Sequence, residues 1–142
     1  MAEIEQNIRV ACDERLFYLG EALRRGVTPE TIHEWSEIDY FFLYKFKHII
    51  DLEKEVAAAE RKDLEILREA KKYGFSDEII AELWGMASED IYALRKANGI
   101  VPVFKMVDTC AGEFESFTPY FYSTYEMEQE SFPSDREKVI VL

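Results

Sequence analysis

The chain has little cysteine, histidine or positive charge. Its 142 residues include two cysteines and two histidines, and 17 Lys and Arg stand against 29 Asp and Glu, which gives a formal net charge of −12 at pH 7. Nucleic acids and anionic membranes are bound through clustered Lys and Arg, so this charge argues against both as partners. Cys12 and Cys110 show no metal-ligand spacing, and no signal peptide is recognisable. We therefore expect reduced thiols and a cytoplasmic protein.

Long apolar runs and glycine-rich loops are also missing. The longest apolar runs fall far short of the ~20 residues of a membrane span, and no loop resembles a phosphate cradle. His33 and His48 have no His or Cys four residues later, which argues against a metal site. Glu113 and Glu115 could serve as an acid and base, but a chance pairing is expected among so many acids. We therefore assign no catalytic, cofactor-binding or metal-binding residue.

Capped helical patterns run from Asp13 to about residue 99. Apolar residues recur at spacings of three and four, which indicates one buried face on each helix, as for Leu16, Leu19 and Leu23. The expected helix starts are Thr28, Ser36, Asp63, Ser76 and Ser88, and the expected stops are Gly26, Gly74, Gly85 and Asn98-Gly99. The sequence therefore predicts an all-α bundle of about six mostly short helices, followed by an extended aromatic C-terminal tail.

The longest helix is expected over residues 37–60. Ser36 to Asp39 resembles a capping box, with a shorter acid than usual, that would open this helix. Its apolar stripe would consist of Ile38, Phe42, Phe46, Ile49 and Val56. We interpret the aromatic part of this stripe, together with Trp35, as core first and as an oligomer face second.

Residues 75–100 hold two capped helices joined near Gly85, a pattern that resembles a helix-turn-helix DNA-binding unit. The second helix opens with Ser88-Glu89-Asp90 and would present carboxylates to the phosphates of DNA. Acids also outnumber the two bases, Arg95 and Lys96. We therefore expect a packed pair of helices, and a DNA-binding regulator is the alternative.

The character of the chain changes after residue 100. Residues 101–107 read as an extended strand. Residues 107–125, VDTCAGEFESFTPYFYSTY, form what we call the aromatic segment, which carries six rings without helical or strand periodicity. Burial of a large ring contributes roughly 2 kcal/mol, so we expect this segment to pack against the helical body or a neighbouring domain.

The C-terminal residues read as a polar stretch followed by the apolar run Val139-Ile140-Val141-Leu142. A β-branched run of this kind is typical of a strand in a parallel sheet. Either it pairs locally with residues 103–107, or it begins a further domain, and we favour the second. Without that domain, residues 126–142 are expected to be frayed.

Several segments resemble the large chain of carbamoyl-phosphate synthetase. The most specific are VDTCAGEF at 107–114 and YSTYE at 122–126, and weaker matches are CDERLF at 12–17, IDYFFL at 38–43, AKKYGFS at 70–76 and Leu94-Arg95. The region they match is the central oligomerization domain between two ATP-grasp halves. The resemblance implies an oligomerization domain at 1–100, an aromatic connector at 101–126, and a linker with the first strand of a truncated ATP-grasp half at 127–142.

For the intact enzyme, the resemblance implies an ATP-dependent, glutamine-hydrolysing ligase. It would make carbamoyl phosphate from bicarbonate and glutamine-derived ammonia, for arginine and pyrimidine biosynthesis. The residues that bind ATP and Mg or Mn lie in the ATP-grasp halves, so none is transferred to this chain. The implied partners are those halves, other large chains and the glutamine amidotransferase small subunit. We therefore expect a non-catalytic scaffold and oligomer contact with no cofactor of its own.

Overall fold

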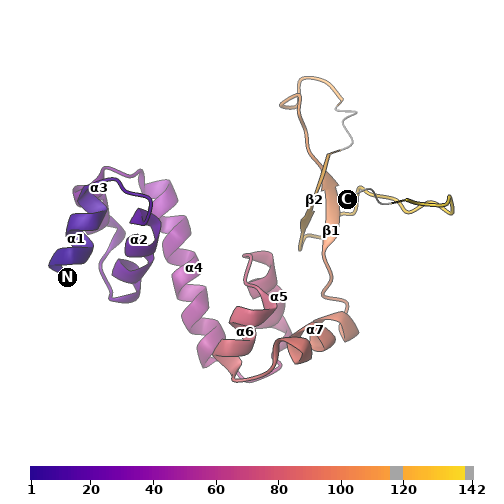
Figure 1. Ribbon diagram of the computed structural model, residues 1–142, viewed down its shortest axis with the longest axis horizontal. Coiled ribbons are helices and arrows are strands. Elements are labelled where there is room, and N and C mark those ends of the chain that lie inside the picture. The colour runs from indigo at the N-terminus through magenta and orange to yellow at the C-terminus, as the bar shows by residue number, and fades with distance from the viewer. Residues whose placement is uncertain (116–119, 140–142) are drawn as a thin grey trace. The chain divides into compact units, whose positions relative to one another are not determined.

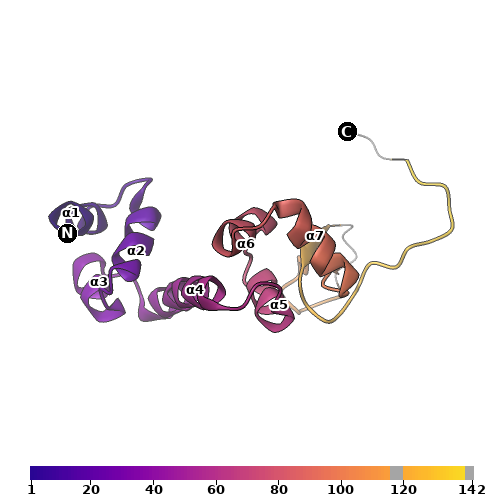
Figure 2. The same ribbon diagram turned by 90° about the horizontal axis from the view of Figure 1, so that it is seen from below.

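The computed structural model describes residues 1–115 and 120–139, and the chain divides into two compact units, Met1–Ile66 and Leu67–Leu142 (Figures 1 and 2). The described elements are α1 Ala2–Arg9, α2 Arg15–Arg24, α3 Pro29–Ser36, α4 Tyr40–Ala58, α5 Leu64–Lys72, α6 Asp77–Trp84, α7 Ser88–Ala97, β1 Val103–Met106 and β2 Phe121–Thr124. The predicted mainly helical fold is confirmed. The boundary between the two compact units lies inside α5. The predicted division into functional segments at residues 100 and 126 is a different division, and it stays a prediction.

In the first unit, α1 packs on α2 and α3, and these two helices pack on α4 (Figure 1). Its core cluster consists of Ile4, Ile8, Leu19, Ala22, Leu23, Ile32, Leu43 and Ile50. Partly buried rings and aliphatic side chains pack against this cluster, among them Trp35 and Phe46. The helix start at Thr28 is confirmed, because its side chain accepts a hydrogen bond from the Thr31 N–H and Pro29 occupies the first turn.

Helix α1 was not predicted from the sequence, which showed a helical pattern only from Asp13. Ile4 and Ile8 lie four residues apart, and both are buried in the core of the first unit. An isolated helix of eight residues is marginal in water, so its stability comes from this packing rather than from propensity. Two apolar positions in so short a stretch give too little periodicity to identify a helix.

The predicted capping box at Ser36 is wrong. Ser36 is the last residue of α3, and its hydroxyl donates back to the Ile32 carbonyl at 2.7 Å. Glu37 then takes a left-handed conformation with φ of 57°, and Asp39 caps α4 by accepting from the Phe41 N–H at 2.8 Å. Serine can satisfy backbone groups at either end of a helix, so its type alone did not fix the boundary. The long helix is therefore shorter at both ends than the predicted 37–60.

The predicted apolar stripe of α4 is only partly correct. Val56 is buried and Phe46 is partly buried, but Phe42 is largely exposed. The side chains that enter the core of the first unit are Leu43 and Ile50, which lie seven residues apart on one face. Because each residue advances about 100° around a helix, Phe42 points well away from Leu43. At the start of α4, Phe42 was thus assigned to the buried stripe, whereas the buried residue is its neighbour Leu43.

The second unit contains the packed pair α6 and α7. Ser76 caps α6 by accepting from the Ile79 N–H at 3.2 Å, and Gly85 ends that helix in a left-handed conformation, as predicted. The predicted cap at Ser88 is wrong by one position: Ala87 precedes α7 without a side-chain cap, and Ser88 is its first residue. The predicted start near Asp63 is confirmed, because its carboxylate accepts from the Glu65 N–H at 2.9 Å.

Strands β1 and β2 form an antiparallel two-stranded sheet in the second unit. The strand expected at 101–107 is confirmed over β1, but its partner is β2, which lies inside the aromatic segment. The sequence Phe121-Tyr122-Ser123-Thr124 puts one ring and one hydroxyl on each face, so apolar and polar residues do not alternate. The alternative in which the C-terminal run pairs with residues 103–107 stays a prediction, because residues 140–142 of that run lie outside the described residues.

Candidate functional site

The first unit exposes four large apolar side chains that together form what we call the aromatic face. Leu16 and Phe17 come from the start of α2, and Phe41 and Phe42 from the first turn of α4; they are 59%, 75%, 62% and 65% exposed. The rings of Phe41 and Phe42 meet edge to face at 5.4 Å. The ammonium of Lys45 lies 5.7 Å from the Phe41 ring. Rings exposed together in this way mark an interaction surface.

The packing of α2 on α4 brings the two halves of the aromatic face together. A Cβ added at Gly20 would lie 3.3 Å from Phe46, and the Arg24 guanidinium pairs with the Glu53 carboxylate at 2.7 Å. Both helices therefore run in the same direction, with later residues of α2 beside later residues of α4. One turn back along each helix, Leu16 and Phe17 come level with Phe42.

The neighbouring tyrosines of α4 are already engaged within the first unit. Tyr40 stacks on the His33 ring at 4.2 Å, and Tyr44 donates its hydroxyl hydrogen to the Glu30 carboxylate. That hydrogen bond raises the pKa of Tyr44 and lowers the pKa of Glu30. Their contacts run back to α3, so the phenylalanines are the rings of the first turn of α4 that are most exposed to a partner.

Sequence reasoning placed part of the aromatic face in the core. The interpretation as core is correct for Trp35 and Phe46, which pack against it, and wrong for Phe42 and Leu16. Phe41 was not singled out. The missed signal is the run Tyr40-Phe41-Phe42 at a helix start, because three successive positions span most of a helical turn and cannot share one buried face.

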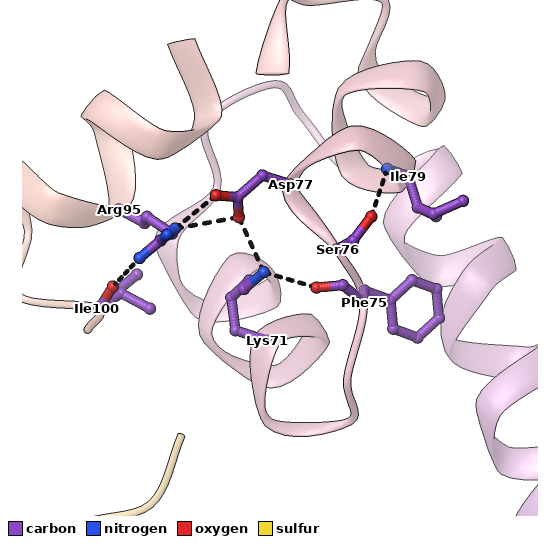
Figure 3. A network of polar contacts seen from close by, with 7 residues as sticks. All are labelled: Lys71, Phe75, Ser76, Asp77, Ile79, Arg95 and Ile100. Carbon is purple, nitrogen blue, oxygen red and sulfur yellow. Dashed lines mark hydrogen bonds and ion pairs between the residues drawn. The ribbon is translucent and has the colours of Figure 1, made fainter. Parts of the chain in front are cut away.

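In the second unit, three charged side chains form what we call the Asp77 cluster (Figure 3). The Asp77 carboxylate accepts from Lys71 Nζ at 2.8 Å and from Arg95 Nε at 2.8 Å. The side chains of Lys71, Asp77 and Arg95 are only 8%, 14% and 12% exposed. Lys71 also donates to the Phe75 carbonyl at 2.7 Å, and Arg95 to the Ile100 carbonyl at 3.4 Å. The cluster thus joins α5, α6 and α7.

Tyr125, the residue after β2, lies against this cluster. Its ring centroid is 5.2 Å from Lys71 Nζ and 5.9 Å from Arg95 Cζ, within the range of cation–π attraction. Burial raises the pKa of the Tyr125 hydroxyl, which keeps the phenol neutral. The helices of the second unit thereby hold the end of the hairpin at one defined point.

The other rings of the aromatic segment behave differently. Phe114, Tyr120, Phe121 and Tyr122 are exposed, so for them the expected packing against the helical body is wrong. For Tyr125 that expectation is confirmed, and Phe117 lies outside the described residues. Packing of the exposed rings against flanking domains stays a prediction.

The lowered pKa of the Asp77 carboxyl predicts that the stability of the second unit depends on pH in the acid range. Burial opposes its ionisation, but hydrogen bonds from Lys71 and Arg95 outweigh burial and hold the pKa of its carboxyl below the ordinary 3.8. A pKa that is lower in the folded state adds stability above the unfolded-state value and loses it as pH falls through the folded-state value.

We therefore expect the melting temperature of the wild-type chain to exceed that of Asp77→Asn at neutral pH, with a gap that narrows below about pH 4. Thermal melts across a pH series would measure this gap. Glu82→Gln, which changes an exposed acid of α6, is the control and should show no comparable pH dependence. A gap of constant size down to the lowest pH would contradict the role given to Asp77.

The residues weighed for chemistry lie mostly at the surface. Glu113 and Glu115 are exposed, and Cys12 and Cys110 are free thiols. In the described part of the chain, no group of three His, Cys, Asp or Glu could hold a metal ion. A cavity of about 550 Å³ beside the Asp77 cluster is lined by Arg68, Glu69, Lys72, Gly99, Ile100, Val101, Lys105, Tyr125, Glu126, Met127 and Glu128. Its charges are of both signs, and Lys105 is paired with Glu126 at 3.0 Å.

The DNA-binding alternative at residues 75–100 is disfavoured by the same contacts. Arg95 is turned inward to Asp77, so its guanidinium is not presented to a phosphate. Lys96 lies over the Tyr92 ring at 5.5 Å. The exposed first turn of α7 carries Glu89 and Asp90. Phosphate recognition needs cations or unopposed donors at this position.

A mainly helical chain with an exposed aromatic face has the features expected of a protein-interaction domain. The family model of the oligomerisation domain of the carbamoyl-phosphate synthetase large chain matches residues 1–99, and the chain belongs to this family. The resemblance noted in the sequence is thereby confirmed. The match includes the aromatic face and the three charged residues of the Asp77 cluster, and it ends before β1. Among the described helices, none is long and apolar enough to span a membrane.

Proposed function

We propose that this chain is a non-catalytic scaffold domain that self-associates through the aromatic face. The observation that carries the proposal is the joint exposure of Leu16, Phe17, Phe41 and Phe42 in a domain of the oligomerisation family. The hydrophobic effect favours covering these side chains, and a second large chain supplies the same apolar surface in return.

Charge supports the aromatic face as the place where two copies meet. The segment from Tyr40 to Ile50 carries Lys45 and Lys47 and no acid, in a chain with a net charge of −12. Repulsion between two acidic chains is therefore reduced when they approach through this segment. Lys45 lies beside Phe41, so it can remain at the rim of such an interface while the rings are buried.

The exposed area is compatible with association of moderate strength. With a large side chain at roughly 200 Å², four side chains that are about two-thirds exposed offer roughly 500 Å² per copy. Two copies together would bury about 1,000 Å² from these residues alone, near the lower end of specific interfaces. We therefore expect a dissociation constant on the order of micromolar rather than an obligate dimer.

In the longer enzyme, we propose that this domain holds large chains together while flanking ATP-grasp halves perform the chemistry. Those halves would bind ATP with Mg or Mn and make carbamoyl phosphate from bicarbonate and ammonia. A glutamine amidotransferase small subunit would supply the ammonia, in the cytoplasm, for arginine and pyrimidine biosynthesis. The support for this role is membership of the oligomerisation-domain family.

Two measurements on the purified chain test the proposal. Sedimentation should show a mass near the 16.7 kDa monomer at low concentration that rises with concentration through the micromolar range. Incubation with ATP, Mg²⁺, bicarbonate and ammonia should give no ATP hydrolysis above background. A strict monomer at all concentrations would contradict self-association, and bicarbonate-dependent ATP turnover would contradict a scaffold without catalysis.

A further inference from the structure

The β1–β2 hairpin has two edges, and the alternation of its hydrogen bonds shows which backbone groups face outward. The Val107 N–H donates to the Tyr120 carbonyl at 2.8 Å, so these two residues form a hydrogen-bonded pair. Such pairs alternate with pairs whose backbone groups point away from the partner strand. In the register of the hairpin, Phe121 and Ser123 lie one and three positions after Tyr120, so they belong to the other kind of pair. Their N–H and C=O groups therefore point away from β1.

The outer edge of β1 is covered by the chain that follows the hairpin. The Phe104 N–H donates to Gln129 Oε1 at 2.7 Å, and the Glu130 N–H donates to the Phe104 carbonyl at 2.9 Å. The Met106 N–H donates to Glu130 Oε2 at 2.6 Å. These contacts block the strand edge with side chains and add an acid to it, which is how proteins prevent further strands from pairing.

In the described part of the chain, no such contacts cover the outer edge of β2. Within residues 1–115 and 120–139, no group bonds to the outward N–H and C=O of Phe121 or Ser123. The rings of Phe121 and Tyr122 are half exposed beside them. Among the described residues, one edge of the hairpin is therefore closed by specific contacts, whereas the other presents unpaired donors and acceptors next to apolar surface. An extended strand satisfies such an edge best.

We propose that this open edge pairs with the β2 edge of a second copy, in an antiparallel register with Tyr122 on the two-fold axis. Phe121 then lies opposite Ser123 of the second copy, and Ser123 lies opposite its Phe121. Both pairs are of the hydrogen-bonded kind, because both residues point their backbone groups outward. The arrangement makes about four new hydrogen bonds and one continuous sheet through both copies.

Charge favours a second copy as the occupant. Strand β2 carries no ionisable acid or base apart from its tyrosine, whereas Glu130 lies against the opposite edge, where its carboxylate accepts from the Met106 N–H. Two chains with a net charge of −12 each therefore repel one another less along β2 than along an acidic segment. The edge buries only a few side chains, so it fits weak pairing that adds to a larger contact. This inference rests on the proposed self-association and assigns it a second surface.

Amide hydrogen exchange at Phe121 and Ser123 tests the pairing without any substitution at the edge. Both amides should exchange at least about tenfold more slowly at high than at low protein concentration, because pairing must open before exchange. The Tyr122 amide faces β1 and serves as the internal control, with an exchange rate that does not depend on concentration. Exchange at Phe121 and Ser123 that is equally fast at all concentrations would overturn the proposal.

A matched pair of variants gives an independent readout. Ser123→Pro removes the outward donor and puts a ring on the edge without removing a β1–β2 hydrogen bond, whereas Ser123→Ala keeps the donor. Sedimentation should give a dissociation constant at least about tenfold higher for Ser123→Pro than for Ser123→Ala. Equal constants would overturn the pairing. If the Tyr122 amide of Ser123→Pro exchanges faster than in the wild type, the substitution has opened the hairpin itself. The wild-type exchange rates at Phe121 and Ser123 then decide whether the β2 edge pairs.

The same exchange measurement in the Phe42→Glu variant separates this inference from the proposed function. If the Phe121 and Ser123 amides of the Phe42→Glu variant still exchange more slowly at high protein concentration, the β2 edge pairs independently of the aromatic face. A second outcome is that Phe42→Glu associates weakly and the wild type shows no protection of the β2 amides. That result would support association through the aromatic face and overturn the β2 pairing. Unchanged association in Phe42→Glu together with protection at β2 overturns the aromatic face instead.

Discussion

Replacing Asp77 with alanine is expected to lower the free energy of unfolding of the second unit by about 3 kcal/mol. Lys71 and Arg95 are nearly buried and share this one carboxylate, so its removal leaves two cations without a counter-charge. Tyr125 would offer only its ring face to them, a weaker interaction than an ion pair. The loss should also loosen the hold of the helices on the end of β2.

Denaturant unfolding followed by tryptophan fluorescence measures this loss. The chain has two tryptophans, Trp35 in the first unit and Trp84 in the second, so a Trp35→Phe background makes Trp84 the reporter. Glu82→Ala is the control, because it removes an exposed acid of α6 in the same unit and should cost about 0.5 kcal/mol or less. Equal losses in Asp77→Ala and Glu82→Ala would show that the Asp77 cluster adds no more than a surface charge.

Replacing Phe42 with glutamate is expected to weaken self-association by about 100-fold. The change removes an exposed ring at the centre of the aromatic face and puts an acid among apolar side chains. An aromatic residue at the centre of an interface contributes about 2 kcal/mol or more, and desolvating the new charge adds to the loss. Phe42 is largely exposed in the single chain, so the melting temperature at low concentration should change little.

The helix ends that were predicted correctly rest on local chemistry. Thr28 and Ser76 cap the helices that follow them, because each side chain reaches a backbone N–H three residues later. Ser36 and Ser88 have the same chemistry but different roles, since a serine is equally compatible with the last turn or the first turn of a helix. Residue type therefore indicated a helix end at each site without giving the exact boundary.

Features that depend on contacts between distant residues were not predictable. Helix α1 is fixed by the core around Ile8, and the choice between Phe42 and Leu43 as the buried position of α4 depends on where α2 and α3 lie. Strand β2 became visible only through its pairing with β1. In each case the local pattern allowed two structures, and tertiary packing selected one.

The Asp77 cluster shows the same limit for the candidate site. Its residues lie at positions 71, 77 and 95, and no local pattern pairs them. Arg95 was therefore weighed only as one of the two bases of a DNA-binding unit. The aromatic face was partly visible as a second interpretation of the Trp35, Phe42 and Phe46 stripe. Family membership, in contrast, was predictable, because segments of specific sequence identified the oligomerisation domain that the family model matches over residues 1–99.

Sedimentation equilibrium of three chains, the wild type, Phe42→Glu and Ala57→Glu, tests the aromatic face most directly. Ala57 is an exposed position of α4 away from the face, so the control adds the same negative charge. Self-association through the aromatic face predicts that wild type and Ala57→Glu share one dissociation constant, whereas Phe42→Glu stays near the 16.7 kDa monomer. The same dissociation constant for all three chains would contradict it.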